Sequence, residues 1–443
     1  MEKDALERWK LWTGIYSKIR TALMLAASDP DGTGFTGFLQ AVHNYLAQLL
    51  TAIQENKPVV WFNLGWNNEF LQAMDITGVC VQQLGVFQNI AQNNEETNAL
   101  IDFAEAHGMP SDLCSADKMS TGAMLRRLYP PPVAHVNVNT PCDSQVVAAQ
   151  AQTEIAPVPQ YFIDIPYYHD DRSVTYVADQ LKGLVPFLVR CTGREFDWDR
   201  MKHVCELSNK VMENIWEWNE WRKNVPVVQP SKLCALNLIV HIMFSGCEDG
   251  VRFSEGLLQE ARLKAKRGDR PFEERVRAIW YQDPVWWDFN LYDWMERELG
   301  LTLPIDVFGY YANHGYIDTS SPEKMLWGLA NKLIRSMPMA RQFRANADFY
   351  IGDFMKLVED YQADCGIYAG HIGCKHGWGA IGLLREACRR VSLPLLVFEF
   401  DMFDPRIMGK EELKNELSRF VNEIVLPRKT AGSKSNPKAW QAR

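Results

Sequence analysis

The chain has 443 residues, a length that one hydrophobic core rarely spans, so two or more domains are expected. Its formal net charge of −8 argues against a nucleic-acid-binding protein, which normally presents a basic surface. No apolar run has membrane-spanning length, and the N-terminus is charged where a secretory signal would be apolar. We therefore expect a cytoplasmic protein, bound to neither membrane nor nucleic acid, with reduced thiols.

Helices and apolar strands alternate along most of the chain. Residues 1–57 carry apolar side chains at helical spacing and contain no strand-like run. Apolar runs bounded by turn residues then predict four strands in each half. These strands are expected within 58–64, 76–82, 132–140 and 159–168, and within 276–287, 301–311, 365–370 and 394–404.

A segment rich in proline and polar residues, 224–231, divides the two sets of strands and is interpreted as a domain junction. Apolar strands that alternate with helices indicate parallel sheets covered by helices. The predicted fold is α/β, with two tandem doubly wound, mostly parallel domains and an N-terminal helical segment. The boundaries are a helical segment at 1–57, α/β domains at 58–224 and 225–427, and a disordered basic tail at 428–443.

Two of the ten cysteines follow predicted strands, where sites form in open α/β sheets. Cys142 follows the strand in 132–140, and Cys374 follows the strand in 365–370. Cys114 comes at the expected start of a helix, and backbone N–H groups at such positions stabilise a thiolate. The alternative is that these cysteines are small buried hydrophobes, since the chain has no Cys-x-x-Cys pair.

Histidines flank Cys374 on both sides. His371 and His376 could donate a hydrogen bond or a proton beside a metal group, or could cap the start of a helix. The chain has no glycine-rich phosphate-binding motif after its first strand, so no nucleotide is expected to bind to this chain alone.

Three segments around these cysteines resemble a known family. They are DLCSAD at 112–117, NVNTPCDSQ at 137–145 and DCGIYAGHIGCK at 364–375. In order and spacing they are similar to the cluster-binding segments of the 2-hydroxyacyl-CoA dehydratase and benzoyl-CoA reductase family. The resemblance extends over most of the chain at low identity.

The resemblance implies a 4Fe–4S cluster between two α/β domains, held by Cys114, Cys142 and Cys374, with one iron open. It also implies a related second subunit, an ATP-hydrolysing iron–sulfur activator that delivers one electron, and an acyl-CoA substrate. An open iron can act as a Lewis acid on a substrate oxygen.

The chain departs from the family pattern near the expected open iron. Leu64 and Gln82 stand where dehydratase-type subunits usually carry serine and glutamate. Leucine cannot form a hydrogen bond with a substrate, and glutamine cannot act as a carboxylate base. Gln82 and His371 are therefore the expected catalytic residues lining the open iron site, with His371 as a candidate acid.

The preferred interpretation is the iron–sulfur subunit of an oxygen-sensitive, anaerobic radical enzyme that dehydrates a 2-hydroxyacyl-CoA or reduces an acyl-CoA. Two alternatives stay open. One is an electron-relay subunit that holds a cluster but no substrate, as the loss of the serine and glutamate would favour. The other is a cluster-free protein that binds a ligand between two lobes.

Overall fold

The computed structural model describes residues 3–66, 68–91, 94–433 and 435–440, and within them two four-stranded parallel sheets. Seven of the eight predicted strand segments contain an observed strand, and the strand expected at 365–370 ends one residue later, at His371. The first sheet consists of β1 (Val59–Phe62), β2 (Thr77–Cys80), β3 (Ala134–Val138) and β4 (Gln160–Ile163). The second consists of β5 (Val276–Gln282), β6 (Leu301–Thr302), β7 (Cys365–His371) and β8 (Leu395–Phe400). The predicted α/β fold with two parallel-sheet domains is thus confirmed.

The two sheets share one topology. The strand orders are β2-β1-β3-β4 and β6-β5-β7-β8, so β1 corresponds to β5 and β3 to β7. β6 is the shortest strand because Pro304, which has no N–H to donate, follows it closely. In this order the chain reverses direction across the sheet between β1 and β3, and between β5 and β7. Binding sites of open α/β sheets lie at this point, beyond the carboxyl ends of the strands.

The N-terminal segment forms two long helices, as expected for the described part of 1–57. In the first half the helices are α1 (Lys3–Ala26), α2 (Thr33–Glu55), α3 (Glu69–Ala73), α4 (Gln83–Ile90), α5 (Asn94–Ala106), α6 (Ser115–Leu125), α7 (Asp143–Ile155), α8 (Asp171–Thr192) and α9 (Trp198–Trp221). These helices pack through their apolar faces against the sheets and against one another.

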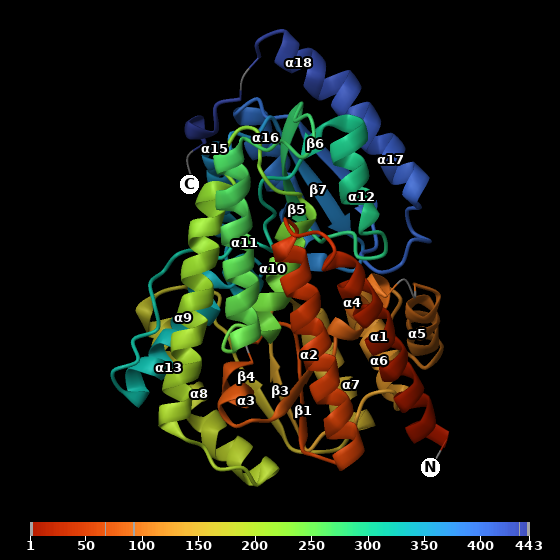
Figure 1. The fold of residues 1–443 in the computed structure, drawn as a ribbon, viewed down its shortest axis with the longest axis vertical. Coiled ribbons are helices and arrows are strands. Elements are labelled where there is room, and N and C mark those ends of the chain that lie inside the picture. The colour runs from red at the N-terminus through yellow and green to blue at the C-terminus, as the bar shows by residue number, and fades with distance from the viewer. Residues whose placement is uncertain (1–2, 67, 92–93, 434, 441–443) are drawn as a thin grey trace.

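The second half has α10 (Lys232–Met243), α11 (Glu248–Arg267), α12 (Asn290–Trp294), α13 (Pro322–Asn331), α14 (Pro338–Arg341), α15 (Ala347–Asp360), α16 (Lys375–Arg390), α17 (Lys410–Arg419) and α18 (Leu426–Thr430). Three π-helical turns span Met295–Leu299, Lys332–Ser336 and Phe420–Val425. The helices α2, α9 and α11 pack side by side along the two sheets (Figure 1). None of the described helices is both long and apolar enough to cross a membrane.

The expected domain junction is anchored by a buried arginine. The guanidinium of Arg222 donates hydrogen bonds of 2.7 Å each to the carbonyl oxygens of Pro304, Leu303 and Gln229. These contacts connect the end of α9 to the segment after β6. Because a buried cation without hydrogen bonds is costly, the three carbonyls hold the side chain in one position.

The C-terminal segment from 428 on packs against the second domain in its described part, which differs from the expected disorder. Lys429 forms an ion pair with Asp364 at 2.7 Å, and the backbone N–H of Asn436 donates to the carbonyl of Val391 at 2.9 Å. A single 3-10 turn spans Pro437–Ala439. Residues 434 and 441–443 of the expected tail lie outside the described residues.

Candidate functional site

The three cysteines singled out in the sequence line one buried cavity of about 80 Å³ between the two domains. We call it the thiol cavity, defined by Cys114, Cys142 and Cys374. Its walls come from the segments after strands of both sheets. The remaining lining includes Leu64, Gln82, Asp117, Gln145, Asp283, His371 and a set of apolar side chains, among them Trp286, Phe308, Phe343, Met402 and Phe403.

Each of the three cysteines is the N-cap residue of a helix. Cys114 precedes α6, Cys142 precedes α7 and Cys374 precedes α16. The first backbone N–H groups of a helix have no partner within the helix, and the helix dipole places partial positive charge there. Three such ends around one cavity favour a bound group with negative charge, such as thiolate or sulfide.

A glycine lets the two domains come close at this cavity. A side chain on Gly373 would lie 2.6 Å from the Cα of Cys114 and 2.7 Å from the carbonyl oxygen of Leu113. Real Cβ atoms do not approach backbone this closely, so any larger residue at 373 would push the two loops apart. Glycine at this position therefore keeps Cys374 near Cys114.

Gln82 lines the thiol cavity, but its amide is engaged in a polar network. Its Oε1 accepts from the N–H of Leu64 at 3.1 Å, and its Nε2 donates to Asp117 at 3.1 Å and to Gln145 at 3.2 Å. Asp117 also accepts from Ser144 at 2.5 Å and from Gln145 at 2.7 Å. The amide of Gln82 therefore orients the buried carboxylate of Asp117.

His371, at the end of β7, contacts groups from both domains. Its Nε2 lies 3.3 Å from the sulfur of Cys114, and its Nδ1 lies 3.5 Å from a carboxylate oxygen of Asp401. The side chain is almost completely buried. His371 thus lies between the thiol of Cys114 and the carboxylate of Asp401 in the second domain.

Asp283 follows β5 directly and adds a second buried carboxyl group to the cavity wall. Only 8% of the residue is exposed, and its Oδ2 has no hydrogen-bond partner among the described residues. Burial raises the pKa of Asp283 to about 6. A carboxyl group in this setting gains or loses its proton near neutral pH.

Burial also keeps the three thiols protonated when no cation lies beside them. It raises the pKa of Cys142 to about 12 and the pKa values of Cys114 and Cys374 well above the ordinary thiol value. A bound cation or metal cluster would supply the positive charge that holds these sulfurs as thiolates.

Within the described part of the chain, no three His, Cys, Asp or Glu side chains lie close enough together to hold one metal ion. A cluster poses a different requirement, because each thiolate binds its own iron and the sulfurs stand farther apart. The three thiols that line the cavity from both domains are the donor type that a 4Fe–4S cluster takes.

Every residue expected at the site lines the thiol cavity: the three cysteines, Gln82, His371 and also Leu64. Their roles remain predictions. The sequence reading missed Asp117 and Asp283. Asp283 follows an apolar strand just as Cys374 does, so the strand-end rule would have found it. Asp117 lies within the first turn after Cys114, where an acidic residue is read as ordinary helix stabilisation.

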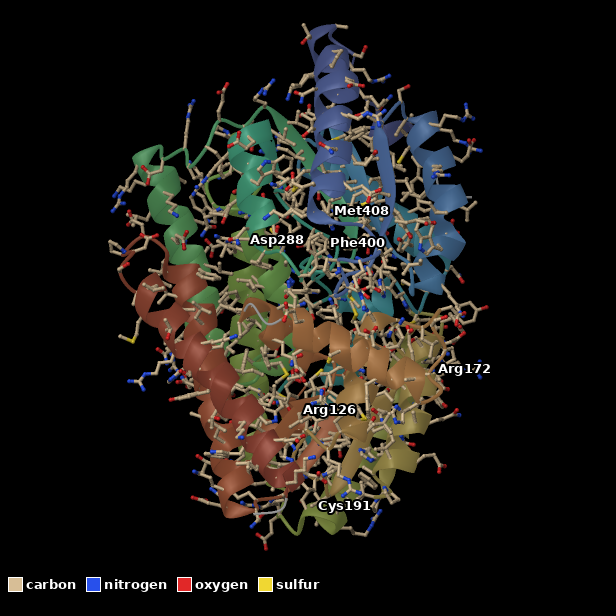
Figure 2. All side chains as sticks on the ribbon, turned by 90° about the vertical axis from the view of Figure 1, so that its right-hand side faces the viewer. Arg126, Arg172, Cys191, Asp288, Phe400 and Met408 are labelled. Carbon is tan, nitrogen blue, oxygen red and sulfur yellow. The ribbon has the colours of Figure 1, made fainter. Side chains whose placement is uncertain are left out.

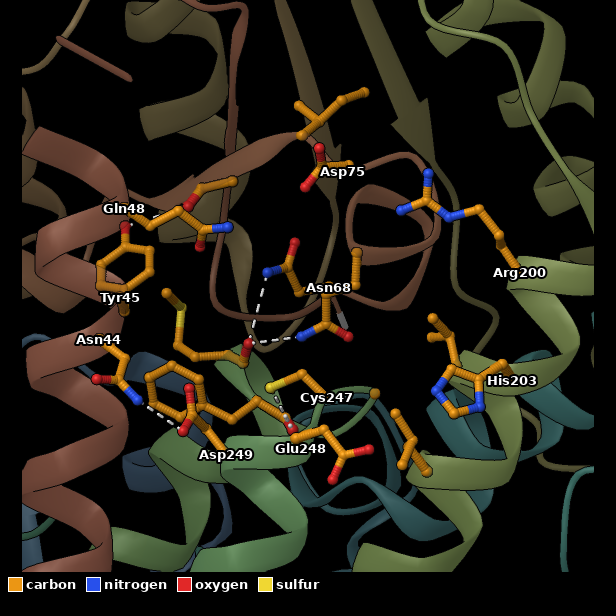
Figure 3. Close-up of a pocket in the computed structure, with 18 of the residues that line it drawn as sticks. Asn44, Tyr45, Gln48, Asn68, Asp75, Arg200, His203, Cys247, Glu248 and Asp249 are labelled. Atoms are coloured by element: carbon orange, nitrogen blue, oxygen red, sulfur yellow. Dashed lines mark hydrogen bonds between the residues drawn. The ribbon is translucent and has the colours of Figure 1, made fainter. Parts of the chain in front are cut away.

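A second, larger hollow of about 810 Å³ lies away from the cysteine helix starts, among α2, α3, α9 and α11 (Figure 3). Polar side chains of both signs line it, including Asp75, Arg200, His203 and Glu248. Its single thiol, Cys247, donates to the carbonyl of Phe244 at 3.3 Å. The mixed charges give this hollow no preference for one class of ligand.

Comparison with known proteins agrees with this arrangement. A family model described as 2-hydroxyglutaryl-CoA dehydratase, D-component, matches residues 64–424. The chain belongs to this family. The match begins at Leu64 in the cavity wall, just after β1, and ends beyond β8, so it includes β2 to β8 and all three cysteines.

Two curated relatives are dehydratase subunits. Lactoyl-CoA dehydratase subunit alpha from Anaerotignum propionicum is 20% identical over 73% of this chain and 81% of its own length. The alpha subunit of (R)-2-hydroxyglutaryl-CoA dehydratase from Acidaminococcus fermentans is 21% identical over 60% of this chain and 55% of its own length. The chain therefore has relatives that are named as subunits of CoA-thioester dehydratases.

Proposed function

We propose that this chain is the 4Fe–4S subunit of an oxygen-sensitive, activator-driven radical enzyme that acts on a CoA thioester. The observation that carries the proposal is the thiol cavity: three cysteines from two domains begin three helices around one space. The family membership supports the thioester as substrate. Dehydration of a 2-hydroxyacyl-CoA is the preferred reaction, and reduction of an acyl-CoA stays the alternative within the same class.

Cys114, Cys142 and Cys374 would hold the cluster, which when bound supplies electron transfer and one iron open to a substrate oxygen. The chain's own groups surround that space. Asp117 holds Ser144 and Gln145 in place at the start of α7. Apolar side chains such as Trp286 and Phe343 exclude water from the cavity, which protects reactive intermediates.

The substrate and partners follow from the same proposal. The two relatives are named as alpha subunits, which supports a second subunit for this chain. We propose that this partner is related in fold and that a separate ATP-hydrolysing iron–sulfur protein supplies the electron. The place of action is the cytoplasm, where thiols stay reduced.

An electron-relay subunit is the second candidate function. The observation that favours it is that neither Leu64 nor Gln82 offers a free polar group to a substrate. Leu64 has no polar side-chain atom, and the amide of Gln82 already serves Leu64, Asp117 and Gln145. In this alternative the cluster would pass electrons to a partner that binds the thioester.

The test is anaerobic co-purification with the partner subunit, followed by iron and sulfide analysis. Cys114→Ser, Cys142→Ser and Cys374→Ser should each lower the iron content, while Cys191→Ser should not. Cys191 is a matched control because it lies near the lower end of the molecule, away from Phe400 at the end of β8 (Figure 2). An iron-free wild type would overturn the proposal in favour of a cluster-free binding protein.

Substrate binding separates the two iron-containing alternatives. Lactoyl-CoA and 2-hydroxyglutaryl-CoA are added to the anaerobic complex while the electron paramagnetic resonance signal of its reduced cluster is recorded. A change in the signal supports a thioester beside the cluster. An unchanged signal with both thioesters would favour the electron relay.

A further inference from the structure

The turn after β5 lines the thiol cavity with a carboxyl group, whereas the turn after β1 lines it with the apolar Leu64. The two sheets share one strand order, so the turn after β5 corresponds to the turn after β1. Leu64 lies in the β1 turn, Asp283 lies in the β5 turn, and both line the thiol cavity. Asp283 thus belongs to the second-domain part of the cavity lining, whereas Leu64 and Gln82 belong to the first-domain part.

The backbone before Asp283 is strained. Gln282 has a φ of 81°, a left-handed conformation that residues other than glycine rarely adopt. Such strain persists only when the surroundings enforce it, and it concentrates at functional sites. The side chain of Gln282 is held by donating to the hydroxyl of Tyr350 at 3.1 Å. The strained residue turns the chain out of β5 and into the cavity wall.

The carboxyl group of Asp283 is buried without the partners that buried carboxylates normally have. Asp117, on the other wall, accepts three side-chain hydrogen bonds. The Oδ2 of Asp283 has none among the described residues, although the residue is only 8% exposed. Leaving a buried polar atom unpaired costs free energy, and such atoms in native structures call for an explanation. A ligand oxygen in the cavity would supply the missing partner.

We propose that Asp283 is the catalytic acid–base residue of this site and exchanges a proton with the thioester or hydroxyl oxygen of an acyl-CoA substrate. This inference rests on the proposed function and names the group that replaces the missing first-domain carboxylate. In the step, the carboxyl O–H bond breaks and an O–H bond forms on the substrate oxygen, leaving a carboxylate. In the reverse step the carboxylate takes the proton back.

Several titratable groups face Asp283 and would shape its pH dependence. Carboxylate charge on Asp401 opposes ionisation of Asp283, whereas a protonated His371 favours it. The remaining facing groups are the hydroxyl of Tyr368 and the thiols of Cys114, Cys142 and Cys374. Because the charge of these thiols changes when a cluster binds, the pH dependence is measured both on the intact, iron-loaded complex and on the iron-free chain.

The experiment compares Asp283→Asn and Asp283→Glu with the control Asp306→Asn. Asp306 is also a buried second-domain carboxyl group, but its Oδ1 accepts from the N–H of Gly309 and it does not line the thiol cavity. With lactoyl-CoA or 2-hydroxyglutaryl-CoA, Asp283→Asn should lower kcat about 10²–10⁴-fold with little change in KM. It should also remove one limb of the pH profile. Asp283→Glu should restore part of kcat, and Asp306→Asn should keep both the rate and the profile.

A second readout does not depend on turnover. The infrared difference between wild type and Asp283→Asn, both labelled with ¹³C-aspartate, should show a buried protonated carboxyl band near pH 5, because the bands of the buried Asp117 and Asp306 cancel. Either thioester should shift this difference band. A difference spectrum without the band, or a band that neither thioester shifts, would overturn the proposal. Iron content distinguishes this failure from failure of the proposed function: iron-loaded protein with an unresponsive band refutes Asp283 alone, whereas iron-free wild type refutes the cluster.

Discussion

The imidazole Nε2 of His371 lies 3.3 Å from the sulfur of Cys114, although 257 residues separate them in the sequence. His371 ends β7 in the second domain, and Cys114 begins α6 in the first. The contact therefore joins the two domains at the wall of the thiol cavity. Among the three thiols, Cys374 also has a side-chain donor, the amide of Gln282 at 4.0 Å, which is farther away than the imidazole is from Cys114.

His371→Phe should make the thiol of Cys114 harder to ionise in the iron-free chain. Burial already raises the pKa of Cys114 well above its ordinary value, and the imidazole is the nearest group that can donate to the sulfur. Alkylation of Cys114 by iodoacetamide, followed by mass spectrometry across pH, should be slower at each pH in the variant. His376→Phe is the matched control and should leave the rate unchanged. Equal rates in wild type and His371→Phe would contradict the expectation.

Gln82→Glu should destabilise the chain increasingly as pH rises. The variant places a second carboxyl group 3.1 Å from the carboxylate of Asp117, where the wild type has an amide donor. Two close carboxylates resist ionisation together, so their folded-state pKa values rise above the unfolded values. The folded variant then holds an extra proton at acidic pH and loses stability as pH rises through those pKa values. Urea unfolding at a series of pH values measures this.

Gln82→Met controls for loss of the amide without added charge. Its unfolding free energy should be lower than that of wild type by about 1–3 kcal/mol, because Asp117 loses one donor. That deficit should also grow as pH rises, because the lost donor favours the charged form of Asp117, but without a second carboxyl group the change should be smaller than in Gln82→Glu. A Gln82→Glu curve parallel to the Gln82→Met curve would show that the two carboxyl groups do not interact.

Lys332→Met should strongly destabilise the contact between the domains. The ammonium of Lys332 is buried and donates to Glu69 at 2.6 Å, to Ser245 at 2.6 Å and to Ser208 at 2.8 Å. Removing one partner of a buried ion pair leaves an uncompensated charge and costs about 3–5 kcal/mol. The double variant Lys332→Met/Glu69→Leu should recover part of this loss in urea unfolding.

The exposed pair Lys324–Asp318 provides the comparison. Both side chains are more than half exposed, so Lys324→Met should change the unfolding free energy by less than about 1 kcal/mol. If Lys332→Met cost no more than Lys324→Met, the buried pair would contribute nothing to the domain contact.

Glu296 should make the wild type lose stability as pH rises toward neutral. Burial raises its pKa from 4.5 to about 7, although the N–H and hydroxyl of Ser231 donate to it. The folded state therefore binds a proton between about pH 4.5 and 7 that the unfolded state has released, so stability falls across this window. Glu296→Gln should remove the contribution of Glu296 to this fall in the free energy of unfolding, which is on the order of 3 kcal/mol.

The exposed Glu298, on the same π-helical turn, is the matched control. Glu298→Gln should give a pH dependence that follows the wild type. A Glu296→Gln curve that also follows the wild type would show that Glu296 keeps an ordinary pKa in the folded chain.

The strands and the cysteine positions could be predicted because both depend on local patterns. Val276–Gln282 and Cys365–His371 are buried on both faces, and continuous apolar runs mark such strands in a sequence. Cys374 comes three residues after the end of its strand, so the general rule for parallel sheets located it. The resemblance to the dehydratase family added Cys114, whose own surroundings gave a weaker signal.

What the sequence did not reveal depends on contacts across the domains. The amide of Gln82 is engaged by Asp117 and Gln145, which are 35 and 63 residues away, and no local pattern encodes such a network. The packing of the C-terminal segment also depends on contacts with residues far away in the sequence. Its basic composition is typical of disorder, but Lys429 finds a carboxylate in Asp364 before β7.

The matched strand orders also allow the helix starts of the two halves to be compared. The helix after β3 starts at Cys142 and the helix after β7 starts at Cys374, so these two positions correspond in the shared topology. The helix before β3 starts at Cys114, whereas the helix before β7 starts at Asn346. The second half thus offers one sulfur where the first offers two. In the proposed cluster, this asymmetry would leave one iron without a protein ligand.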